Sequence, residues 1–400
     1  MMDKPEILAP VGNLVMLKAA IDAGADAIYF GVKGFNMRAS ARNFELNQIK
    51  NVVDKCHESD VKAYLALNII IYDDELEKVD ETIKLAKKAG VDAVICWDLS
   101  IVNACKKHGL EFHISTQASI SNFESLKFYH SIGASRVVLA RECTIDQIKD
   151  IKRKIEEEKL DVEIEAFVHG AMCVSISGRC FLSQFMFCKS ANRGECLQPC
   201  RRSYMLIDKE TGDELKVGND YILSPKDMCT LPIIEKLIEA GIDSFKIEGR
   251  MRSEEYVKEV VSAYRNAVDS YPNILKDKLL DKVSKVYNRG FSEGFYMGKP
   301  INEWTDEYGS KATTKKVYLG KVKNYFEKIG AFEMKLESDI LKIGDVVMVQ
   351  GPTTGVVENK INSIQLNGEN SDSAKRNNRI GIKYSHKVRP NDKVFKIENN

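Results

Sequence analysis

Residues 76–98 read LEKVDETIKLAKKAGVDAVICWD and contain one complete helix-to-strand unit. Val79, Ile83 and Ala86 recur at the spacing of one face of an amphipathic helix, which Gly90 can end as a C-cap. The apolar run that follows the glycine is typical of a short buried strand. The sequence therefore predicts a helix that is followed at once by a strand.

The same unit recurs along the first part of the chain. Phrases with a glycine, small or polar residues and an apolar run begin at Gly24, Gly133 and Gly241. With the strand-like runs between them, the predicted strands are EILAP, AIYFG, AYLALNI, AVICWD, EFHIST, RVVLAR, VEIEAFV and SFKIEGR. Apolar strands that alternate with helices indicate a parallel sheet covered on both faces. Eight of them predict an α/β fold, a (β/α)8 TIM-like barrel rather than an open sheet.

The strand pattern also divides the chain. We assign residues 1–310 to the barrel, with a cysteine-rich insertion at about 169–243 and a helical extension at 252–300. Short alternating runs broken by glycine, asparagine and proline predict a small C-terminal all-β barrel at 315–400. Active sites of (β/α)8 barrels lie at the C-terminal ends of the strands, so we expect the long insertion to overhang the catalytic face.

Composition and hydropathy limit the cellular location and the kinds of partner that we expect. The 400 residues are 44% hydrophobic and carry a formal net charge of +1. No apolar run approaches the roughly 18 residues that cross a bilayer, and the first residues lack the features of a secretory signal. We expect a globular, cytoplasmic protein with no membrane contact, in which any nucleic-acid site is a local patch.

Five of the ten cysteines lie between Glu165 and Arg202. In the cytoplasm, clustered thiols more often bind metal, do redox chemistry or act as nucleophiles than form disulfides. The C-x6-C and C-x3-C spacings match structural zinc sites poorly, and widely spaced thiolates that converge from loops fit an iron–sulfur cluster. The alternative is that cysteines are small buried hydrophobes. We prefer that alternative for Cys56, Cys96, Cys105 and Cys143.

Several phrases together resemble the signature of the U32 family, historically labelled collagenase-like peptidases. They are EAFVHGAMCVSISGRCFLS at 165–183, NRGECLQPCRRSY at 192–204 and LSPKDMC at 223–229. FNMRASARNF, STQASISN, LAREC, IEGRMRS and YNRGFSEGFY match as well, so the resemblance spans essentially the whole chain.

The resemblance implies an iron–sulfur enzyme. Members of the family include a prephenate-dependent tRNA uridine hydroxylase, an enzyme acting on a ribosomal RNA cytidine and a pair serving ubiquinone synthesis, and several hold a [4Fe-4S] cluster. The cluster ligands that it implies here are Cys173, Cys180, Cys196 and Cys229, with Cys200 as the alternative fourth ligand and Cys188 incidental.

The residues and the resemblance leave three candidate functions. The first is hydroxylation of an RNA base, most specifically a tRNA wobble uridine to 5-hydroxyuridine, with prephenate as co-substrate. The second is a U32-type peptidase, and the third is an RNA-binding accessory protein with a structural cluster. The expected partners are tRNA or another RNA, a small carboxylic acid, and a second copy or a paralogue of the chain.

The residues themselves offer little for a peptidase. The sequence has neither an H-E-x-x-H metal motif nor a G-x-S-x-G nucleophile elbow. His169 could activate Cys173, but such a pair would leave the other thiols without a role.

Other candidate site residues follow from their positions at predicted strand ends, except Arg201 and Arg202, which directly follow Cys200. The expected catalytic residues are Glu165, His169, Arg141, Glu248 and Arg250. The expected substrate-binding residues are Arg38, Arg42, Asn68, Gln117, Arg201 and Arg202, and Glu142 is a further candidate. Arginine matches carboxylates in a bidentate fashion, although salt bridges on the barrel rim would explain the same residues.

A basic stretch with interleaved tyrosines precedes and enters the C-terminal region. Tyrosine rings can stack on bases, and lysines can contact phosphates, although charge runs are often solvated faces. The residues concerned are Lys311, Lys315, Lys316, Lys321, Lys323, Tyr318 and Tyr325.

Overall fold

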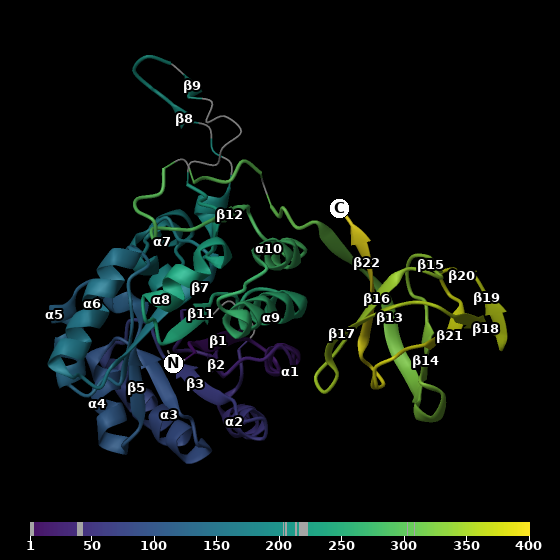
Figure 1. The fold of residues 1–400 in the computed structure, drawn as a ribbon, viewed down its shortest axis with the longest axis horizontal. Helices are drawn as coiled ribbons and strands as arrows, with labels where there is room; N and C mark the ends of the chain where they lie inside the picture. Colours follow the sequence, from purple (N-terminus) through teal and green to yellow (C-terminus); the bar gives the residue numbers. More distant parts are fainter. Residues whose placement is uncertain are drawn as a thin grey trace.

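The computed structural model describes residues 4–37, 43–202, 204, 206–212, 214–215, 223–301, 303–307 and 309–400. Arg38 and Arg42, two of the expected substrate-binding residues, lie outside the described residues. Figure 1 shows a larger α/β part and a smaller all-β part beside it.

Eight parallel strands form a closed barrel, which confirms the predicted (β/α)8 fold. They are β1 (Glu6–Val11), β2 (Ala27–Phe30), β3 (Lys62–Ala66), β4 (Ala93–Cys96), β5 (Glu111–Ile114), β6 (Arg136–Val138), β7 (Glu163–Ala171) and β11 (Ser244–Ile247). Each strand pairs with the next, and β11 pairs with both β1 and β7, which closes the barrel.

Helices alternate with the strands and cover the outside of the barrel. They are α1 (Leu14–Asp22), α2 (Ile49–His57), α3 (Leu76–Ala89), α4 (Leu99–His108), α5 (Phe123–Ser131), α6 (Ile145–Glu158), α8 (Ile234–Glu239) and α9 (Glu254–Ser270). Helix α3 ends where the sequence predicts, because Gly90 adopts the left-handed conformation with φ of 85°. Alternate strand residues such as Ile7 and Ala9 point outward into the main apolar core.

Charged residues fill part of the barrel interior. Glu165 is fully buried and contacts the Nζ of Lys246 and, at 3.5 Å, the guanidinium of Arg136. Arg136 also lies 2.5 Å from Glu6 at the N-terminal end of the barrel. Buried charges need such partners because the low-dielectric interior does not solvate them.

The insertion follows β7 and lies over one end of the barrel (Figure 1). Its elements are η4 (Ile176–Gly178), α7 (Leu182–Phe187), η5 (Ala191–Arg193), η6 (Pro199–Arg201), β8 (Leu206–Ile207), β9 (Glu214–Leu215), β10 (Asp227–Cys229) and η7 (Leu231–Ile233). Strand β10 pairs antiparallel with the end of β7 and parallel with β12 (Phe291–Ser292), so this part of the insertion extends the barrel sheet. Helix α10 (Lys276–Ser284) packs on α9.

The C-terminal region is antiparallel and all-β, as the sequence predicts. Its larger sheet has the strand order β17-β16-β22-β13-β14-β21-β18-β19. The strands are β13 (Thr314–Phe326), β14 (Ala331–Lys335), β16 (Val346–Gly351), β17 (Gly355–Lys360), β18 (Ile364–Leu366), β19 (Glu369–Ser371), β21 (Arg379–Lys383) and β22 (Lys393–Asn399). A turn, η8 (Glu327–Ile329), follows β13, and β15 (Leu341–Lys342) pairs with β20 (Ser373–Ala374).

The two parts share a contact between the barrel wall and β17. Ala19 of α1 packs with Met348 and Val356 in a small apolar cluster. Beside it, the Nζ of Lys316 donates to Glu255 at 2.8 Å. Among the described helices, none is both long enough and apolar enough to cross a bilayer.

Candidate functional site

A small cavity of about 50 Å³ opens at the C-terminal end of the barrel. Five residues named from the sequence line it, each just beyond a strand: Asn68, Gln117, Arg141, Glu248 and Arg250. The carboxyl ends of parallel strands meet at this edge, which is why residues far apart in the chain converge there. The structure thus brings these five residues into one polar site.

Hydrogen bonds order the polar groups of this cavity. Asn68 Nδ2 donates to Gln117 Oε1 at 3.1 Å, and Arg250 NH1 donates to Asn36 Oδ1 at 3.1 Å. The guanidinium of Arg141 lies 4.1 Å from the ring centre of Phe167. Contacts within the protein therefore hold both arginines in place at the cavity.

Lys246 lines the same cavity and was missed by our sequence analysis. Burial lowers its pKa, while the neighbouring Glu165 carboxylate acts in the opposite direction. The signal in the sequence was a single lysine inside the apolar strand SFKI, where a charge needs a buried partner.

Glu165 itself does not line the cavity. It lies in the barrel interior between Lys246 and Arg136, as a partner for both cations. The sequence predicts a catalytic role for Glu165. In the structure both carboxylate oxygens of Glu165 contact charged groups of the protein instead.

His169 also differs from expectation. The register of β7 and β11 shifts between Lys246 and Ile247, so that Ile247 lies opposite His169 and Val168 is skipped. Such a bulge reverses the alternation of side chains. His169 consequently packs among the rings of Tyr256, Tyr264 and Phe291 instead of facing the cavity.

The environment of His169 makes it a weak base. Its Nδ1 lies 3.4 Å from the hydroxyl of Tyr264. Burial lowers the pKa of His169 to about 3, with a smaller contribution from the charge of Arg252. The imidazole is a poor general base for a thiol at neutral pH.

Cys200 lies near enough to three other insertion cysteines, Cys173, Cys180 and Cys196, to be affected by them electrostatically. Burial raises the pKa of Cys200, and the nearby thiols of Cys173, Cys196 and Cys180 raise it further, against the effect of Arg201. Two backbone N–H groups donate to sulfur: that of Ser175 to Cys173 at 3.5 Å, and that of Leu182 to Cys180 at 3.3 Å. Hydrogen bonds of this kind tune iron–sulfur centres.

Cys229 stands apart from this group. It is buried on β10 opposite His169, with its Sγ 3.9 Å from the hydroxyl of Tyr264. Burial raises the pKa of Cys229 to about 12, and the other groups that affect it are Leu231, Tyr264 and Glu293. The arrangement favours Cys200 over Cys229 as the fourth cysteine beside Cys173, Cys180 and Cys196.

The four cysteines are not arranged as a complete metal site. In the part of the chain that the structure describes, no three His, Cys, Asp or Glu side chains are arranged to hold a metal ion. The donor set nevertheless suits an iron–sulfur cluster, since its ligands are thiolates. The four thiols would have to draw together around it.

A second cavity, of about 120 Å³, lies between the insertion and the barrel rim. Arg141, Glu142, Cys173 and Ser177 line it, and Arg141 lines the central cavity as well. The backbone N–H of Ser177 donates to Glu142 Oε1 at 3.2 Å, and Ser177 has a φ of 46°, in the left-handed region. Such backbone strain in a non-glycine residue is often found at functional sites.

Two buried oxygens at this second cavity lack partners. Among the described residues, none makes a hydrogen bond to Ser177 Oγ or Glu142 Oε2. An unpaired buried oxygen costs free energy unless a solvent or ligand group satisfies it. Both oxygens belong to residues that line the cavity together with Cys173.

The two arginines that follow Cys200 differ in exposure. Arg201 is turned inward, donating to Ser224 Oγ at 2.8 Å, to the carbonyl of Pro225 at 2.7 Å and to the carbonyl of Met172. These contacts hold parts of the insertion together. Arg202 is exposed, with its guanidinium 4.6 Å from the ring centre of Phe187.

Part of the basic stretch before the C-terminal region is engaged within the protein. Lys311 pairs with Asp306, Lys315 with Glu398 and Lys316 with Glu255. Tyr318 donates to Glu337 at 3.2 Å, and Tyr325 packs against the C-terminal core. Lys321 and Lys323 are exposed.

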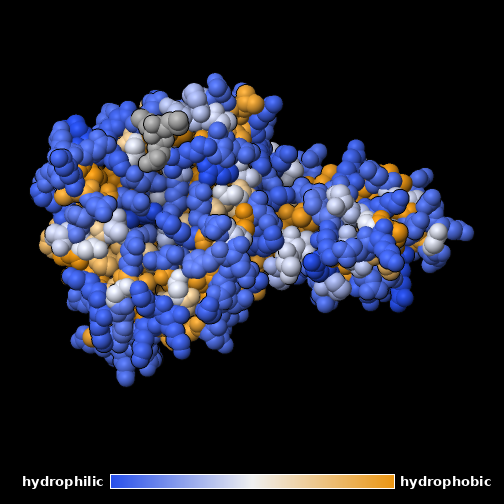
Figure 2. Space-filling view, turned by 60° about the horizontal axis from the view of Figure 1, so that its bottom comes forward, coloured by the Kyte–Doolittle hydropathy of each residue, from blue (hydrophilic) through white to orange (hydrophobic). Residues whose placement is uncertain are grey.

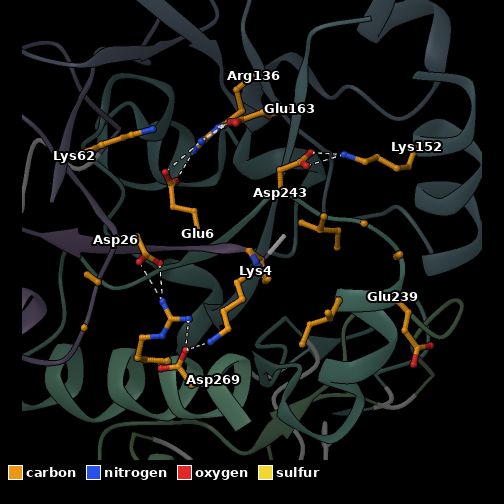
Figure 3. A pocket seen from close by; sticks show the side chains of 18 of the residues that line it. Lys4, Glu6, Asp26, Lys62, Arg136, Lys152, Glu163, Glu239, Asp243 and Asp269 are labelled. Atoms are coloured by element: carbon orange, nitrogen blue, oxygen red, sulfur yellow. Dashed lines mark hydrogen bonds and ion pairs between the residues drawn. The ribbon is translucent and has the colours of Figure 1, made fainter. Parts of the chain in front are cut away.

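A larger cavity, of about 1220 Å³, lies at the opposite end of the barrel. Figure 3 shows that its charged side chains point toward one another, as in the pairs Arg136 with Glu6 and Lys152 with Asp243. The N-terminal face of such barrels usually serves stability. We therefore place the functional site at the mouth and not in this larger cavity.

The fold and the site define a (β/α)8 barrel whose mouth is covered by a cysteine-rich insertion. The model of peptidase family U32 matches residues 12–306, and the chain belongs to this family.

Curated relatives carry two kinds of name. The chain is 42% identical to a collagenase of Porphyromonas gingivalis, over 98% of each chain. It is 35% identical to tRNA hydroxylation protein P1 of Bacillus subtilis, over 98% of this chain and 95% of that protein. It is 38% identical to the 23S rRNA 5-hydroxycytidine synthase of Escherichia coli, over 66% of this chain and 39% of that protein.

Proposed function

We propose that this protein is an iron–sulfur enzyme that hydroxylates an RNA base. The observation that carries the proposal is the gathering of four thiols beside the barrel mouth, in a chain that resembles RNA hydroxylation proteins over nearly its whole length. The proposed ligands of a [4Fe-4S] cluster are Cys173, Cys180, Cys196 and Cys200. A bound cluster would supply a redox-active or Lewis-acidic iron centre next to the second cavity.

The finer proposal is conversion of a tRNA wobble uridine to 5-hydroxyuridine with prephenate. Insertion of one oxygen atom into the C5–H bond is a two-electron oxidation of the base. The co-substrate that donates the oxygen is reduced by the same two electrons. Prephenate carries two carboxylates, and Arg141, Lys246 and Arg250 supply positive charge at the central cavity.

The second cavity suits the edge of the target base. Glu142 Oε2 can accept a hydrogen bond from a base N–H, and Ser177 Oγ can donate to a base carbonyl. The central cavity holds about two waters at its present volume, so binding of the acid requires the surrounding side chains to move.

The first experiment measures iron and acid-labile sulfide on protein purified without oxygen. We expect about four of each per chain, and their loss in Cys173→Ala and Cys200→Ala. Cys188→Ala is the matched control, because Cys188 is an exposed cysteine of the same insertion. If iron were retained in Cys200→Ala but lost in Cys229→Ala, Cys229 and not Cys200 would be the fourth ligand. Absence of iron from wild type would overturn the cluster.

The activity is tested separately by nucleoside analysis of RNA from a deletion strain. Wild type should restore a hydroxylated pyrimidine, and Cys173→Ala should not. Equal loss of RNA binding and of modification in Cys173→Ala would instead favour an accessory protein with a structural cluster. Omission of prephenate from a reconstituted reaction tests the co-substrate.

Peptidase activity is the second candidate, because a relative at 42% identity is named a collagenase. The geometry offers it little support, since His169 is buried among aromatic rings and has a lowered pKa. Collagen cleavage by the purified protein that is abolished in Cys173→Ala would restore this candidate.

A further inference from the structure

An apolar surface lies beside the thiols on the outside of the insertion. We call it the α7 face, defined by Ile176, Phe181, Phe185, Met186 and Leu197. Phe181 is 64% exposed and Phe185 is 84% exposed, and their ring centres are 6.3 Å apart. On the face of the molecule drawn in Figure 2, hydrophilic side chains predominate and apolar ones gather in separate patches. An exposed apolar patch of this kind often marks an interaction site.

The α7 face lies in the most basic part of the insertion. Residues 173–202 contain five lysines and arginines and one glutamate, a formal charge of +4, whereas the whole chain carries +1. Arg193 pairs with Glu75 and Lys189 with Glu195, and Arg201 is turned inward, so the charge at the surface comes mainly from the other two arginines. Arg179 and Arg202 are exposed at its borders. The guanidinium of Arg179 lies 5.6 Å from the ring centre of Trp97, and Arg179 NH2 donates to Ser119 Oγ at 2.9 Å.

Two residues of the α7 face adjoin the proposed reaction site, one in the chain and one in space. Phe181 directly follows Cys180, and Ile176 lines the cavity that contains Cys173 and Glu142. Ile176 is thus the residue of the α7 face through which a ligand on the two phenyl rings would have to reach the second cavity.

We propose that the α7 face binds single-stranded RNA by stacking unpaired bases on Phe181 and Phe185. Arg179 and Arg202 would contact the adjacent phosphates. The inference rests on the proposed RNA hydroxylation and deepens it, because it names the surface that presents the target base. Exposed aromatic rings beside cations are the usual arrangement for sequence-tolerant binding of single strands.

The charge of the insertion favours RNA over a protein partner. The buried centre of a protein–protein interface is depleted of charged residues, whereas a nucleic-acid site combines stacking rings with a local excess of positive charge. Here the rings and the guanidinium groups lie within one short segment.

Fluorescence anisotropy with a labelled RNA hairpin that has a pyrimidine-rich loop tests the proposal. Stacking on one ring contributes enough that Phe185→Ala or Phe181→Ala should weaken the Kd roughly 5- to 150-fold. Phe128→Ala is the matched control, because Phe128 is a 59% exposed ring on α5, and it should bind as wild type does. Phe185→Trp should retain binding, and Arg202→Gln should reduce the salt slope of log Kd by about 1.

Three results would overturn the proposal, and they are distinguishable. Wild-type RNA binding that both phenylalanine variants retain would exclude the α7 face but leave RNA hydroxylation standing. Absence of RNA binding and of RNA modification by wild type would remove the proposed function as well. Unchanged RNA binding, with a smaller mass for Phe185→Ala by light scattering, would identify the α7 face as a contact between protein copies. Unchanged iron content and thermal unfolding establish that the variants are folded.

Discussion

Glu165 is the residue on which the charge balance of the barrel interior depends. It is fully buried between Lys246 and Arg136. Glu165→Ala would leave these cations without this carboxylate, and we expect it to lower the free energy of unfolding by about 3–5 kcal/mol. Urea unfolding of the barrel measures the effect.

The control for this prediction is Glu163→Ala. Glu163 also contacts Arg136, but it is half exposed, and exposed ion pairs contribute at most about 1 kcal/mol. A loss of similar size in the two variants would show that burial does not determine the contribution of Glu165.

Because His169 is buried, we expect the free energy of unfolding to depend on pH in the acid range. The folded protein keeps the imidazole neutral down to its pKa of about 3, whereas the unfolded chain takes up the proton below about pH 6.5. The unfolded state then binds more protons, so the free energy of unfolding falls as the pH drops from 6.5 toward 3, by at most about 1.4 kcal/mol per pH unit. Above pH 6.5 this contribution is fully present.

His169→Gln removes the titrating group and is expected to flatten this part of the pH profile. The measurement is urea unfolding of both proteins at several pH values. A variant profile parallel to that of wild type would mean that other groups cause the acid dependence.

At the scale of the elements, Arg193 fastens the insertion to the barrel. Its guanidinium donates to Glu75 Oε2 at 2.6 Å and to the carbonyl of Ile70 at 2.6 Å. These groups lie between β3 and α3, so the contact links η5 to the barrel rim. Charge-assisted hydrogen bonds that are partly buried contribute about 1.5–3 kcal/mol.

We therefore expect Arg193→Ala to open the insertion without unfolding the barrel. Limited proteolysis should cut within residues 172–202 about tenfold faster or more, since 1.4 kcal/mol corresponds to tenfold. Lys189→Ala is the control, because Lys189 pairs at 3.2 Å with Glu195 in an exposed contact within the insertion. Equal protection of wild type and Arg193→Ala would contradict this role.

At the scale of the whole molecule, the C-terminal region has its own apolar core and a separate small contact with the barrel. Met348 is buried in that contact against Ala19. Met348→Asp would place a charge in an apolar contact, which is unfavourable without a partner.

We expect Met348→Asp to separate the two parts while each stays folded, which would raise the radius of gyration measured by small-angle X-ray scattering. Ile329→Asp is the matched control, because Ile329 is an exposed isoleucine of the same region. An unchanged radius for Met348→Asp would show that the polar contact between Lys316 and Glu255 suffices to hold the parts together.

The architecture follows from local patterns in the amino-acid sequence. The periodicity of helices and strands is a local property of the sequence. It therefore predicts the glycine-capped helices, the eight apolar strands and the alternating runs of the C-terminal region. The same reasoning placed Asn68, Gln117, Arg141, Glu248 and Arg250 at strand ends, where the barrel topology brings them together.

Which side chains face one another depends on contacts between distant parts of the chain. The bulge between β7 and β11 turns His169 outward, and the pairing of Lys246 with Glu165 depends on the same register. The insertion likewise sets Cys200, and not Cys229, beside the other thiols. These contacts join residues that are distant in the chain, so their geometry depends on strand register and loop packing, which local sequence patterns do not encode.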